Sequence, residues 1–361
     1  MTITKLRQDG PQTEEKIAEM ELMRLAEEII KGRRLTEEDD LSVLVEGDLA
    51  ELCQGADEIR RALCGDRVDL CSIINGRSGR CSEDCKFCAQ SAHNPTACET
   101  YGFLHTEEFK AGCGCGEEQG LDRYSIVTAG RTLAGEDLEK AVKAYHAMHE
   151  AYPEMGLCAS HGLMKEEDLG RLYEAGVRMY HTNLETSRRY FPRICTTHTY
   201  EDKLEQIRRA RAAGLSVCSG GILGMGESWQ DRLDMAALLA RLEVESIPLN
   251  FLIPIPGTPL EKTERLTCEE ILRIVALFRY LNPTARIRIA AGRNYFDNGG
   301  AVLFRAGANG ALTGDMLTTV GNSTAEDREM FEGLGFQMRE AKKETEGSTG
   351  HEGQKMEKGR E

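Results

Sequence analysis

Short apolar runs recur along the middle of this chain, and most are followed by a stretch long enough for an amphipathic helix. This alternation is typical of repeated strand–helix units, which build a parallel sheet. Eight runs are predicted to be strands: 69–74, 123–129, 156–160, 177–183, 215–221, 245–251, 285–291 and 309–313. Eight strands close a (β/α)8 barrel of the TIM type, so we expect this α/β fold. An open, doubly wound sheet is the alternative, because strand counts from a single sequence are error-prone.

The first part of the chain has a helical pattern instead. Apolar residues from Leu22 to Ile29 recur on one face of a helix, which Gly32 would end. A second helix is expected to begin near Thr36, because three acidic residues follow it and suit a first helical turn. Both helices are interpreted as packing elements outside the barrel.

The sequence therefore divides into three predicted regions. Residues 1–66 form an N-terminal helical extension, and residues 67–338 form the barrel. Residues 339–361 contain a single large apolar residue, Met356. Such a segment buries too little surface to order itself, so we expect a disordered tail.

Three cysteines, Cys81, Cys85 and Cys88, lie directly after the first predicted strand. A four-iron, four-sulfide cluster normally has a thiolate on every iron, so three thiolates without a fourth nearby leave one iron open. A zinc site is the alternative, but zinc prefers paired C-x-x-C units with four ligands in total, and this region has one such pair. The pattern favours an iron–sulfur cluster at the carboxyl end of a strand, where barrels of this type place their chemistry.

The charge balance narrows the kind of partner. The chain has 45 Lys and Arg against 60 Asp and Glu, a formal net charge of −15. An acidic surface repels nucleic acid and anionic membranes, so a small-molecule substrate is expected. The sequence shows no signal-like N-terminus and no apolar run of membrane-spanning length, which predicts a cytoplasmic protein. Its 13 cysteines are then expected to be metal ligands and buried thiols rather than disulfides.

The spacing C-x3-C-x2-C, with Phe87 before the last cysteine, resembles that of the radical S-adenosylmethionine (SAM) enzymes. The flanking run CKFCAQSAH is similar to the biotin synthase family, and more to the forms of anaerobic bacteria than to the best-studied ones. Three further segments share this likeness: 217–221, 250–252 and 291–293. The resemblance covers roughly residues 69–321.

This resemblance implies a radical sulfur-insertion reaction. SAM would bind the open iron of the 4Fe-4S cluster and be cleaved by one electron to methionine and a 5′-deoxyadenosyl radical. The radical would remove hydrogen atoms from dethiobiotin at C9 and then C6, and an auxiliary iron–sulfur cluster would supply the sulfur that completes biotin. The family likeness also implies a reducing partner such as flavodoxin or ferredoxin, and a homodimer.

The resemblance assigns a SAM site to five residues. Phe87 would lie near the adenine, and Glu185 would bind the ribose diol with its carboxylate. Gly221 and Ile222 would contact SAM after the fifth strand, where glycine lets a backbone approach a ligand closely. Lys203 stands where the better-studied enzymes use an arginine for the SAM carboxylate, so a point charge replaces a bidentate fork. The plain alternatives are loop packing for Phe87 and a helix N-terminal charge for Glu185.

The auxiliary cluster departs from the common family pattern, which is a two-iron cluster. Cys158 and Cys218 match two of its cysteine ligands, and Arg288 matches its unusual arginine ligand. The remaining thiol is missing, because Ser125 stands on the second predicted strand where a cysteine is expected. A hydroxyl is a much poorer ligand for iron than a thiolate.

Two other cysteines are candidates to replace the missing thiol. Cys71 lies on the first predicted strand, next to the second, and is the leading replacement. Cys195 follows the fourth predicted strand and would reach the cavity from its rim. Because a buried free cysteine also behaves as a small apolar side chain, a purely structural role is the alternative for each. We hypothesise that the auxiliary cluster is a larger assembly held by Cys71 together with Cys158 and Cys218.

The resemblance also implies four substrate contacts. The amides of Asn183 and Asn250 would bind the ureido group, since an amide both donates and accepts hydrogen bonds. Thr318 and Thr319 would bind the substrate carboxylate. His181 replaces a residue that is usually asparagine, so this edge of the pocket differs from the common pattern. Hydrogen-bonded strand ends are the alternative for these residues.

Cys113 and Cys115 are separated and flanked by glycine, which has a low helix propensity. A flexible loop is expected there, with an extra metal or persulfide site as the alternative. Two other functions stay open at this point. Another radical SAM enzyme would need the three clustered cysteines without the auxiliary set, and a metal-binding scaffold would bind zinc and cleave no SAM.

Overall fold

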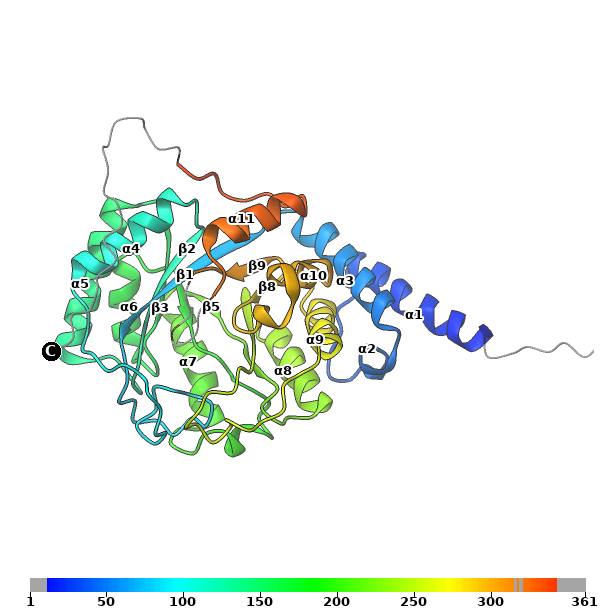
Figure 1. The fold of residues 1–361 in the computed structure, drawn as a ribbon, viewed down its shortest axis with the longest axis horizontal. Coiled ribbons are helices and arrows are strands. Elements are labelled where there is room, and N and C mark those ends of the chain that lie inside the picture. The colour runs from blue at the N-terminus through cyan, green and yellow to red at the C-terminus, as the bar shows by residue number, and fades with distance from the viewer. Residues whose placement is uncertain (1–11, 315–316, 318–320, 343–361) are drawn as a thin grey trace, which may run out of the picture.

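A closed parallel barrel forms the centre of the computed structural model, which describes residues 12–314, 317 and 321–342 (Figure 1). Its strands are β1 (Asp69–Arg77), β2 (Arg123–Thr128), β3 (Gly156–Ser160), β4 (Met179–His181), β5 (Ser216–Cys218), β6 (Gly221–Leu223), β7 (Ser246–Phe251), β8 (Arg286–Ile289) and β9 (Gly310–Leu312). The order β5-β4-β3-β2-β1-β9-β8-β7-β6, with β5 also paired to β7, closes the sheet. Because β5 and β6 are two halves of one interrupted strand, the prediction of a (β/α)8 barrel is confirmed.

The interrupted fifth strand changes partner at its break. β5 pairs with β4, and β6 pairs with β7. Two bridges join the halves to the opposite neighbours: Cys218 pairs with Ser246 on β7, and Glu185 pairs with Gly221. The break therefore brings the backbone of the fifth strand next to the loop that follows β4.

Helices surround the barrel and bury their apolar faces against it. They are α4 (Thr106–Glu118), α5 (Gly135–Ala151), α6 (Glu166–Glu174), α7 (Tyr200–Ala212), α8 (Trp229–Arg241), α9 (Cys268–Leu281), α10 (Ala301–Arg305) and α11 (Thr324–Gly333), with 3-10 turns η1 (Phe191–Arg193), η2 (Arg293–Tyr295) and η3 (Asp297–Gly300). On α9, Ile271, Ile274 and Phe278 share one face and are fully buried. Each such side chain stabilises the fold by roughly 1.5–3 kcal/mol. Thr267 caps this helix with a reciprocal bond to Glu270.

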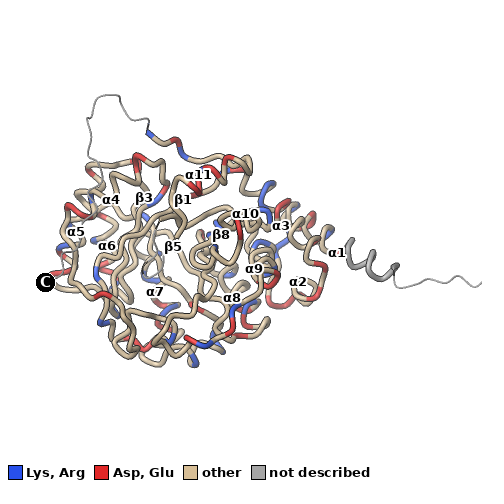
Figure 2. The backbone as a smooth tube through the Cα atoms, in the orientation of Figure 1, with Lys and Arg blue, Asp and Glu red and all other residues tan. Residues whose placement is uncertain are grey.

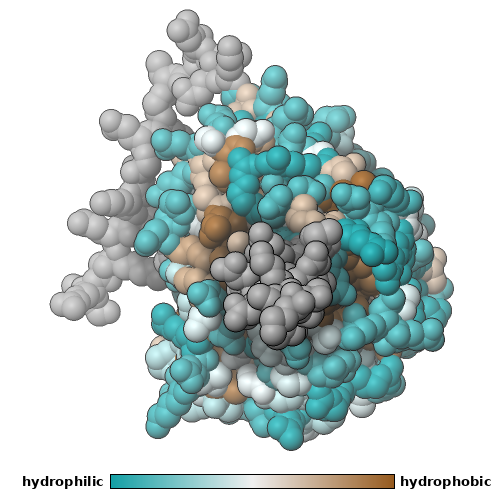
Figure 3. Space-filling model, turned by 90° about the vertical axis from the view of Figure 1, so that its right-hand side faces the viewer, coloured by the Kyte–Doolittle hydropathy of each residue, from teal (hydrophilic) through white to brown (hydrophobic). Residues whose placement is uncertain are grey.

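The N-terminal helices pack outside the barrel against α9. They are α1 (Gln12–Ile30), α2 (Ser42–Glu46) and α3 (Leu49–Cys64), and both α2 and α3 contact α9. The expected helix before Gly32 is present. The predicted helix start at Thr36 is wrong, because the Asp39 carboxylate accepts a hydrogen bond from the Thr36 N–H (2.8 Å) and closes a turn there. Hydrophilic side chains dominate this side of the molecule (Figure 3).

The expectation of a flexible loop around Cys113 and Cys115 is also wrong. Both residues lie in α4, with Cys113 buried and Cys115 exposed. A Cβ at Gly112 would lie 2.1 Å from the Tyr124 hydroxyl, and a Cβ at Gly114 would lie 2.3 Å from the Tyr152 hydroxyl. The glycines are thus needed for close helix packing, which overrides their low helix propensity.

Acidic and basic residues are interspersed along the described backbone (Figure 2). No helix within the described part of the chain is long and apolar enough to cross a membrane. The structure describes residues 339–342 of the predicted tail, where the Lys342 N–H donates to the Glu118 carbonyl on α4 (3.0 Å). Residues 343–361 lie outside the described residues, so the tail and the three-region division stay predictions.

Candidate active site

A chamber of about 430 Å³ opens inside the barrel toward the carboxyl ends of the strands. Residues from all of the barrel strands contribute to its wall. Twelve of the predicted site residues line it: Cys71, Cys81, Cys85, Phe87, Cys88, Cys158, Asn183, Glu185, Cys218, Ile222, Asn250 and Arg288. The fold therefore brings the two predicted groups of cysteines to one cavity.

The loop after β1 holds Cys81, Cys85 and Cys88 by backbone hydrogen bonds. The Cys81 N–H donates to the Gln90 carbonyl (2.9 Å), and the Asn94 amide donates to the carbonyls of Cys85 (3.1 Å) and Cys88 (2.8 Å). Burial raises the pKa of the Cys88 thiol to about 11. Such a thiol gives up its proton readily only to a metal, which stabilises the thiolate.

These three thiols fit a cluster better than a single ion. A single ion needs ligand atoms close together, but the sulfur atoms of Cys81, Cys85 and Cys88 do not all lie within 4.8 Å of one another. A four-iron cluster spreads its thiolate ligands over a larger volume. The donor set therefore fits the iron–sulfur prediction rather than the zinc alternative.

Glu83 and Asp84, which lie between Cys81 and Cys85, connect the cluster loop to the segment before α7. The Asp84 carboxylate accepts hydrogen bonds from the N–H groups of Thr196 (2.8 Å) and Thr197 (3.2 Å). Partial burial raises the pKa of Asp84, but the hydrogen bonds, led by those from Thr196, outweigh it and hold that pKa well below its usual range. The Lys86 N–H also donates to the Ile194 carbonyl (3.0 Å). This anchor was not predicted from the sequence, although the Glu–Asp pair between the cysteines was its visible sign.

Glu185 is held in the chamber by an unusual backbone. Its φ of 71° lies in the left-handed region, which a non-glycine residue adopts only where the surroundings enforce it. Its N–H donates to the Gly220 carbonyl (3.1 Å), and its carbonyl accepts from the Ile222 N–H (2.9 Å). A Cβ at Gly221 would lie 2.3 Å from that carbonyl oxygen, so this position requires glycine.

The Glu185 side chain is half-buried and lines the same chamber as the cysteines of the cluster loop. Burial raises the pKa of its carboxyl group, and the nearby Lys203 ammonium opposes that rise. Asn183 donates from its amide to the carboxylate (3.3 Å). Lys203 lies on α7 and is not among the described residues that line the chamber. Phe87 and Ile222 both pack against a buried apolar group that includes Met225 and Leu252.

The second group of cysteines comes from the strands themselves. Cys71, Cys158 and Cys218 are buried on β1, β3 and β5. Burial raises the pKa of the Cys218 thiol to about 11, although the positive charge of Arg288 opposes this. The Arg288 guanidinium donates to the carbonyls of Asp69 (3.0 Å) and Ala311 (2.9 Å) and pairs with the Asp69 carboxylate.

Ser125 lies in this chamber beside the strand cysteines. On the sheet it pairs in register with Cys158 of β3, whereas Cys71 of β1 pairs with Arg123 of the same strand as Ser125. Successive inward positions on a strand are two residues apart. Cys71 and Ser125 therefore occupy neighbouring levels of one cavity.

Cys195 has a different setting from the strand cysteines. Its sulfur lies 3.2 Å from the Asp84 carboxylate and 3.2 Å from Nδ1 of His198. It is not among the described residues that line the chamber. The structure thus places Cys195 behind the cluster loop rather than with Cys158 and Cys218.

The predicted substrate amides both line the chamber, and both also bind the backbone near the break in the fifth strand. Asn183 accepts a hydrogen bond from the Gly220 N–H (3.1 Å), and Asn250 donates to the Gly221 carbonyl (3.2 Å). Each amide keeps some hydrogen-bonding capacity. Thr318 and Thr319 lie outside the described residues.

His181 was not predicted to act in the auxiliary site, yet its Nδ1 lies 3.5 Å from the Cys218 sulfur. Burial lowers its pKa to about 4, so its ring is neutral at pH 7 and can serve as a hydrogen-bond partner. The alternation of inward residues on the strand after position 177 was the sequence signal for this contact.

Comparison with known proteins agrees with this geometry. The Radical SAM superfamily profile matches residues 77–239, and the Biotin and Thiamin Synthesis associated domain matches residues 248–337. The solved structure of methylornithine synthase (PylB) covers 88% of this chain and 98% of its own, with a TM-score of 0.76 at 21% identity. The hydrogenase maturase HydG covers 90% of this chain and 77% of its own, with a TM-score of 0.74 at 16% identity. Because both sequence identities are low, these two structures support the fold and nothing more.

The cysteine loop, the barrel and the superfamily match define this chain as a radical SAM enzyme. Curated relatives narrow the class further. The biotin synthase of Clostridium beijerinckii is 57% identical over 87% of this chain and 99% of its own length. That of Alkaliphilus metalliredigens is 56% identical over 88% and 100%. This chain belongs to the biotin synthase family.

Proposed function

We propose that this chain converts dethiobiotin to biotin by radical sulfur insertion. The observation that carries the proposal is the single chamber that joins the loop cysteines to the strand cysteines. A SAM-derived radical and a sulfur source must reach the same substrate carbon, so both sites have to open into one enclosed space. A cavity of about 430 Å³ is in the usual range for a small-molecule site.

When bound, the 4Fe-4S cluster and SAM supply the 5′-deoxyadenosyl radical, and the auxiliary cluster supplies the sulfur. Cys81, Cys85 and Cys88 would hold the first cluster. Glu185 would orient the SAM ribose, with Gly221 and Ile222 giving a close backbone surface and Phe87 packing beside the adenine. Lys203 would act on the SAM carboxylate through its charge rather than as a wall of the chamber.

The role of the remaining residues is to position dethiobiotin and exclude water. The carbons that react are not acidic, so no acid–base side chain is needed to activate them. Asn183 and Asn250 would bind the ureido group with their remaining hydrogen-bonding capacity. The apolar wall includes Met179, Ala290 and Leu312, which keep water from the radical. A reductant of the flavodoxin or ferredoxin kind would deliver the electron, and a homodimer is the proposed assembly.

We assign the auxiliary cluster to Cys71, Cys158, Cys218 and Arg288, in a larger assembly than a two-iron cluster. Three thiols and a guanidinium from four strands face one cavity, while Ser125 offers no thiolate. Iron and sulfide counts on Cys71→Ser would test this ligand set. Loss of auxiliary iron is expected, and an unchanged auxiliary cluster would refute the assignment. Ser125→Cys is the variant to compare with Cys71→Ser, because it restores the cysteine that the common family pattern has at this position.

The function is tested by anaerobic incubation of the reconstituted chain with SAM, a strong reductant and dethiobiotin. We expect both biotin and 5′-deoxyadenosine, read by mass spectrometry. If 5′-deoxyadenosine formed without biotin in a sample verified to hold both clusters, the substrate would be wrong although the radical chemistry stood.

A further inference from the structure

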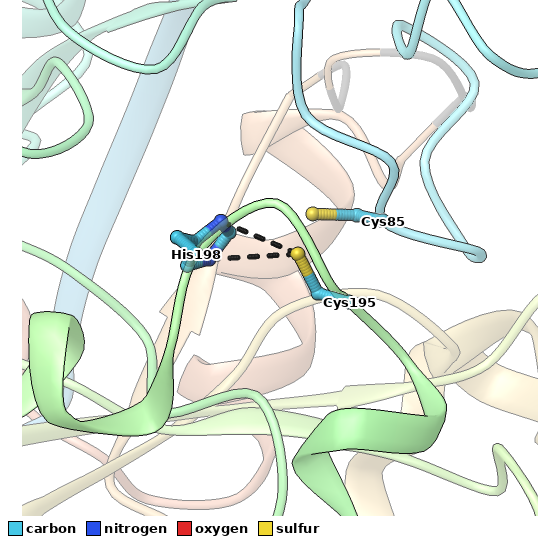
Figure 4. A group of neighbouring side chains, drawn as sticks. All are labelled: Cys85, Cys195 and His198. Carbon is cyan, nitrogen blue, oxygen red and sulfur yellow. Dashed lines mark hydrogen bonds between the residues drawn. The ribbon is translucent and has the colours of Figure 1, made fainter.

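Cys195, His198 and Cys85 form a compact group behind the cluster loop (Figure 4). Cys85 comes from the loop after β1, whereas Cys195 and His198 come from the segment between η1 and α7. One ligand atom from each of the three lies within 4.8 Å of the other two. Within the described residues, no other set of three histidine, cysteine or acidic side chains meets this condition.

The separation between Cys195 and His198 is close to that of two ligands around one tetrahedral ion. Zinc binds thiolates at about 2.3 Å and imidazole at about 2.0–2.1 Å, which puts the sulfur and nitrogen ligands about 3.6 Å apart. The Cys195 sulfur lies 3.9 Å from Nε2 of His198 and 3.2 Å from Nδ1. Both side chains are at least nine-tenths buried, so an ion here would be shielded from solvent.

The His198 ring is already oriented as a metal ligand would be. Its Nδ1 lies 2.5 Å from the Glu83 carboxylate, a contact that favours a proton on that nitrogen and would leave Nε2 to bind an ion. Imidazole ligands commonly carry such a carboxylate partner on their other nitrogen. Glu83 is itself buried and also accepts a hydrogen bond from the Thr197 hydroxyl (2.9 Å).

From this geometry we propose a second metal site, in which the cluster-free chain binds one divalent transition-metal ion through Cys85, Cys195 and His198. Two thiolates and one imidazole suit zinc or ferrous iron, with water or a carboxylate as fourth ligand. Binding needs both sulfurs as thiolates and the imidazole neutral, so it releases the protons that these groups still carry and changes no oxidation state. The ion occupies Cys85, so it excludes the 4Fe-4S cluster; this competition rests on the proposed role of Cys85 in that cluster.

Cobalt titration of the full cluster-free chain, kept reduced and anaerobic, tests the site. We expect one equivalent of Co²⁺ with the absorption of tetrahedral thiolate coordination. Cys195→Ser should abolish this spectrum, while Cys88→Ser and the exposed-thiol control Cys268→Ser should keep it. Loss of the spectrum in Cys88→Ser with retention in Cys195→Ser would overturn the proposal, because the ion would then bind the cluster cysteines.

A second measurement tests the hydrogen bond between Glu83 and His198. Glu83→Gln keeps the size of the side chain but removes its charge, and should weaken Co²⁺ binding by about tenfold to a hundredfold. Circular dichroism on each variant verifies that it is folded. Unchanged Co²⁺ affinity in Glu83→Gln, together with unchanged Co²⁺ affinity in His198→Asn, would show that the His198 imidazole is not a ligand of the ion.

Competition with the cluster is measured by reconstitution with and without one equivalent of Zn²⁺. Zinc should slow the appearance of the electron paramagnetic resonance signal of the reduced 4Fe-4S cluster, read after reduction of each sample, in the parent chain but not in Cys195→Ser. Equal inhibition of both would contradict the shared use of Cys85. The zinc-free samples separately report whether Cys81, Cys85 and Cys88 bind a cluster at all.

Discussion

The two groups of cysteines in the chamber are built in different ways. Cys81, Cys85 and Cys88 lie within one loop, and local hydrogen bonds to Gln90 and Asn94 shape it. The strand group comes from β1, β3 and β5, so only closure of the barrel brings its members together. The loop site is thus shaped mainly by one short segment, which Asp84 anchors to the segment before α7, whereas the strand site depends on the whole fold.

This difference predicts which substitutions remove one cluster and leave the other in place. A substitution in the loop should remove one cluster and leave the other, because the barrel does not depend on the loop. A substitution on a strand should affect the auxiliary cluster and, where it disturbs packing, the scaffold as well.

Cys88→Ala should have the largest effect. The variant loses a thiolate of the SAM-binding cluster, so 5′-deoxyadenosine formation should fall below about one thousandth of the parent rate. Auxiliary iron should be retained, which Mössbauer spectroscopy of reconstituted protein would measure. Simultaneous loss of both clusters would show that the two sites are not independent.

Cys158→Ala should separate the two activities. Biotin formation should fall by about a hundredfold or more, because the sulfur source loses a buried ligand. Reductive cleavage of SAM needs only the loop site, so 5′-deoxyadenosine should still form at a rate within severalfold of the parent. An equal loss of biotin and 5′-deoxyadenosine would contradict the assignment of SAM cleavage to the loop site and of sulfur supply to the strand site.

Gly221→Ala should affect the SAM site through the backbone. The new methyl group would collide with the Glu185 carbonyl, and overpacking of this kind costs about 1–3 kcal/mol. SAM affinity should therefore fall by about tenfold to a hundredfold, measured by equilibrium dialysis. Gly170→Ala on α6 is the control, since a Cβ there meets nothing within 4 Å. Equal affinity in both variants would mean that Glu185 does not act on SAM.

Mild acid should weaken the strand scaffold through His161. Burial, with Arg77 nearby, lowers the pKa of this ring to about 3. Tyr145 links it to the strand that carries Cys158, because the Tyr145 hydroxyl donates to the Cys158 carbonyl (3.1 Å) and lies 3.0 Å from Nε2 of His161. In the unfolded chain the ring titrates near pH 6.5. The folded pKa is the lower one, so this stability is complete above about pH 6.5 and decreases as the pH falls toward 3.

By pH 5 the loss amounts to about 2 kcal/mol of unfolding free energy. Urea unfolding of the cluster-free chain at pH 7 and pH 5 would measure it. His161→Gln retains hydrogen-bonding groups but cannot titrate. The change in its unfolding free energy between pH 7 and pH 5 should therefore be smaller than that of the parent by about 2 kcal/mol. The same pH dependence in parent and variant would assign the effect to other groups.

Much of this molecule could be predicted from its sequence. The eight strand positions and the loop cysteines are encoded locally, by apolar runs and by spacing. The N-terminal turn at Thr36 and the helix through Cys113 were predicted wrongly, since each depends on partners that local propensity does not include: the Asp39 side chain in one, and the hydroxyls of Tyr124 and Tyr152 in the other.

The candidate site shows the same limit. Cys195 lies next to Cys85 because Asp84 binds the backbone of Thr196 and Thr197, a contact between segments 112 residues apart. No spacing rule within either segment gives that contact. The family resemblance likewise pointed to the strand cysteines, but the alignment of Ser125 with Cys158 needed the register of the sheet.

The interrupted fifth strand also has a consequence for motion. The barrel closes there through two bridges, from Cys218 to Ser246 and from Glu185 to Gly221. One bridge contains a proposed auxiliary ligand and the other a proposed SAM contact, so this thinly paired seam of the barrel coincides with both sites. Thin pairing favours local opening, which amide hydrogen exchange detects. Ligands that bind across the seam would hold it shut, and slowed exchange at residues 216–223 would then report occupancy of either site.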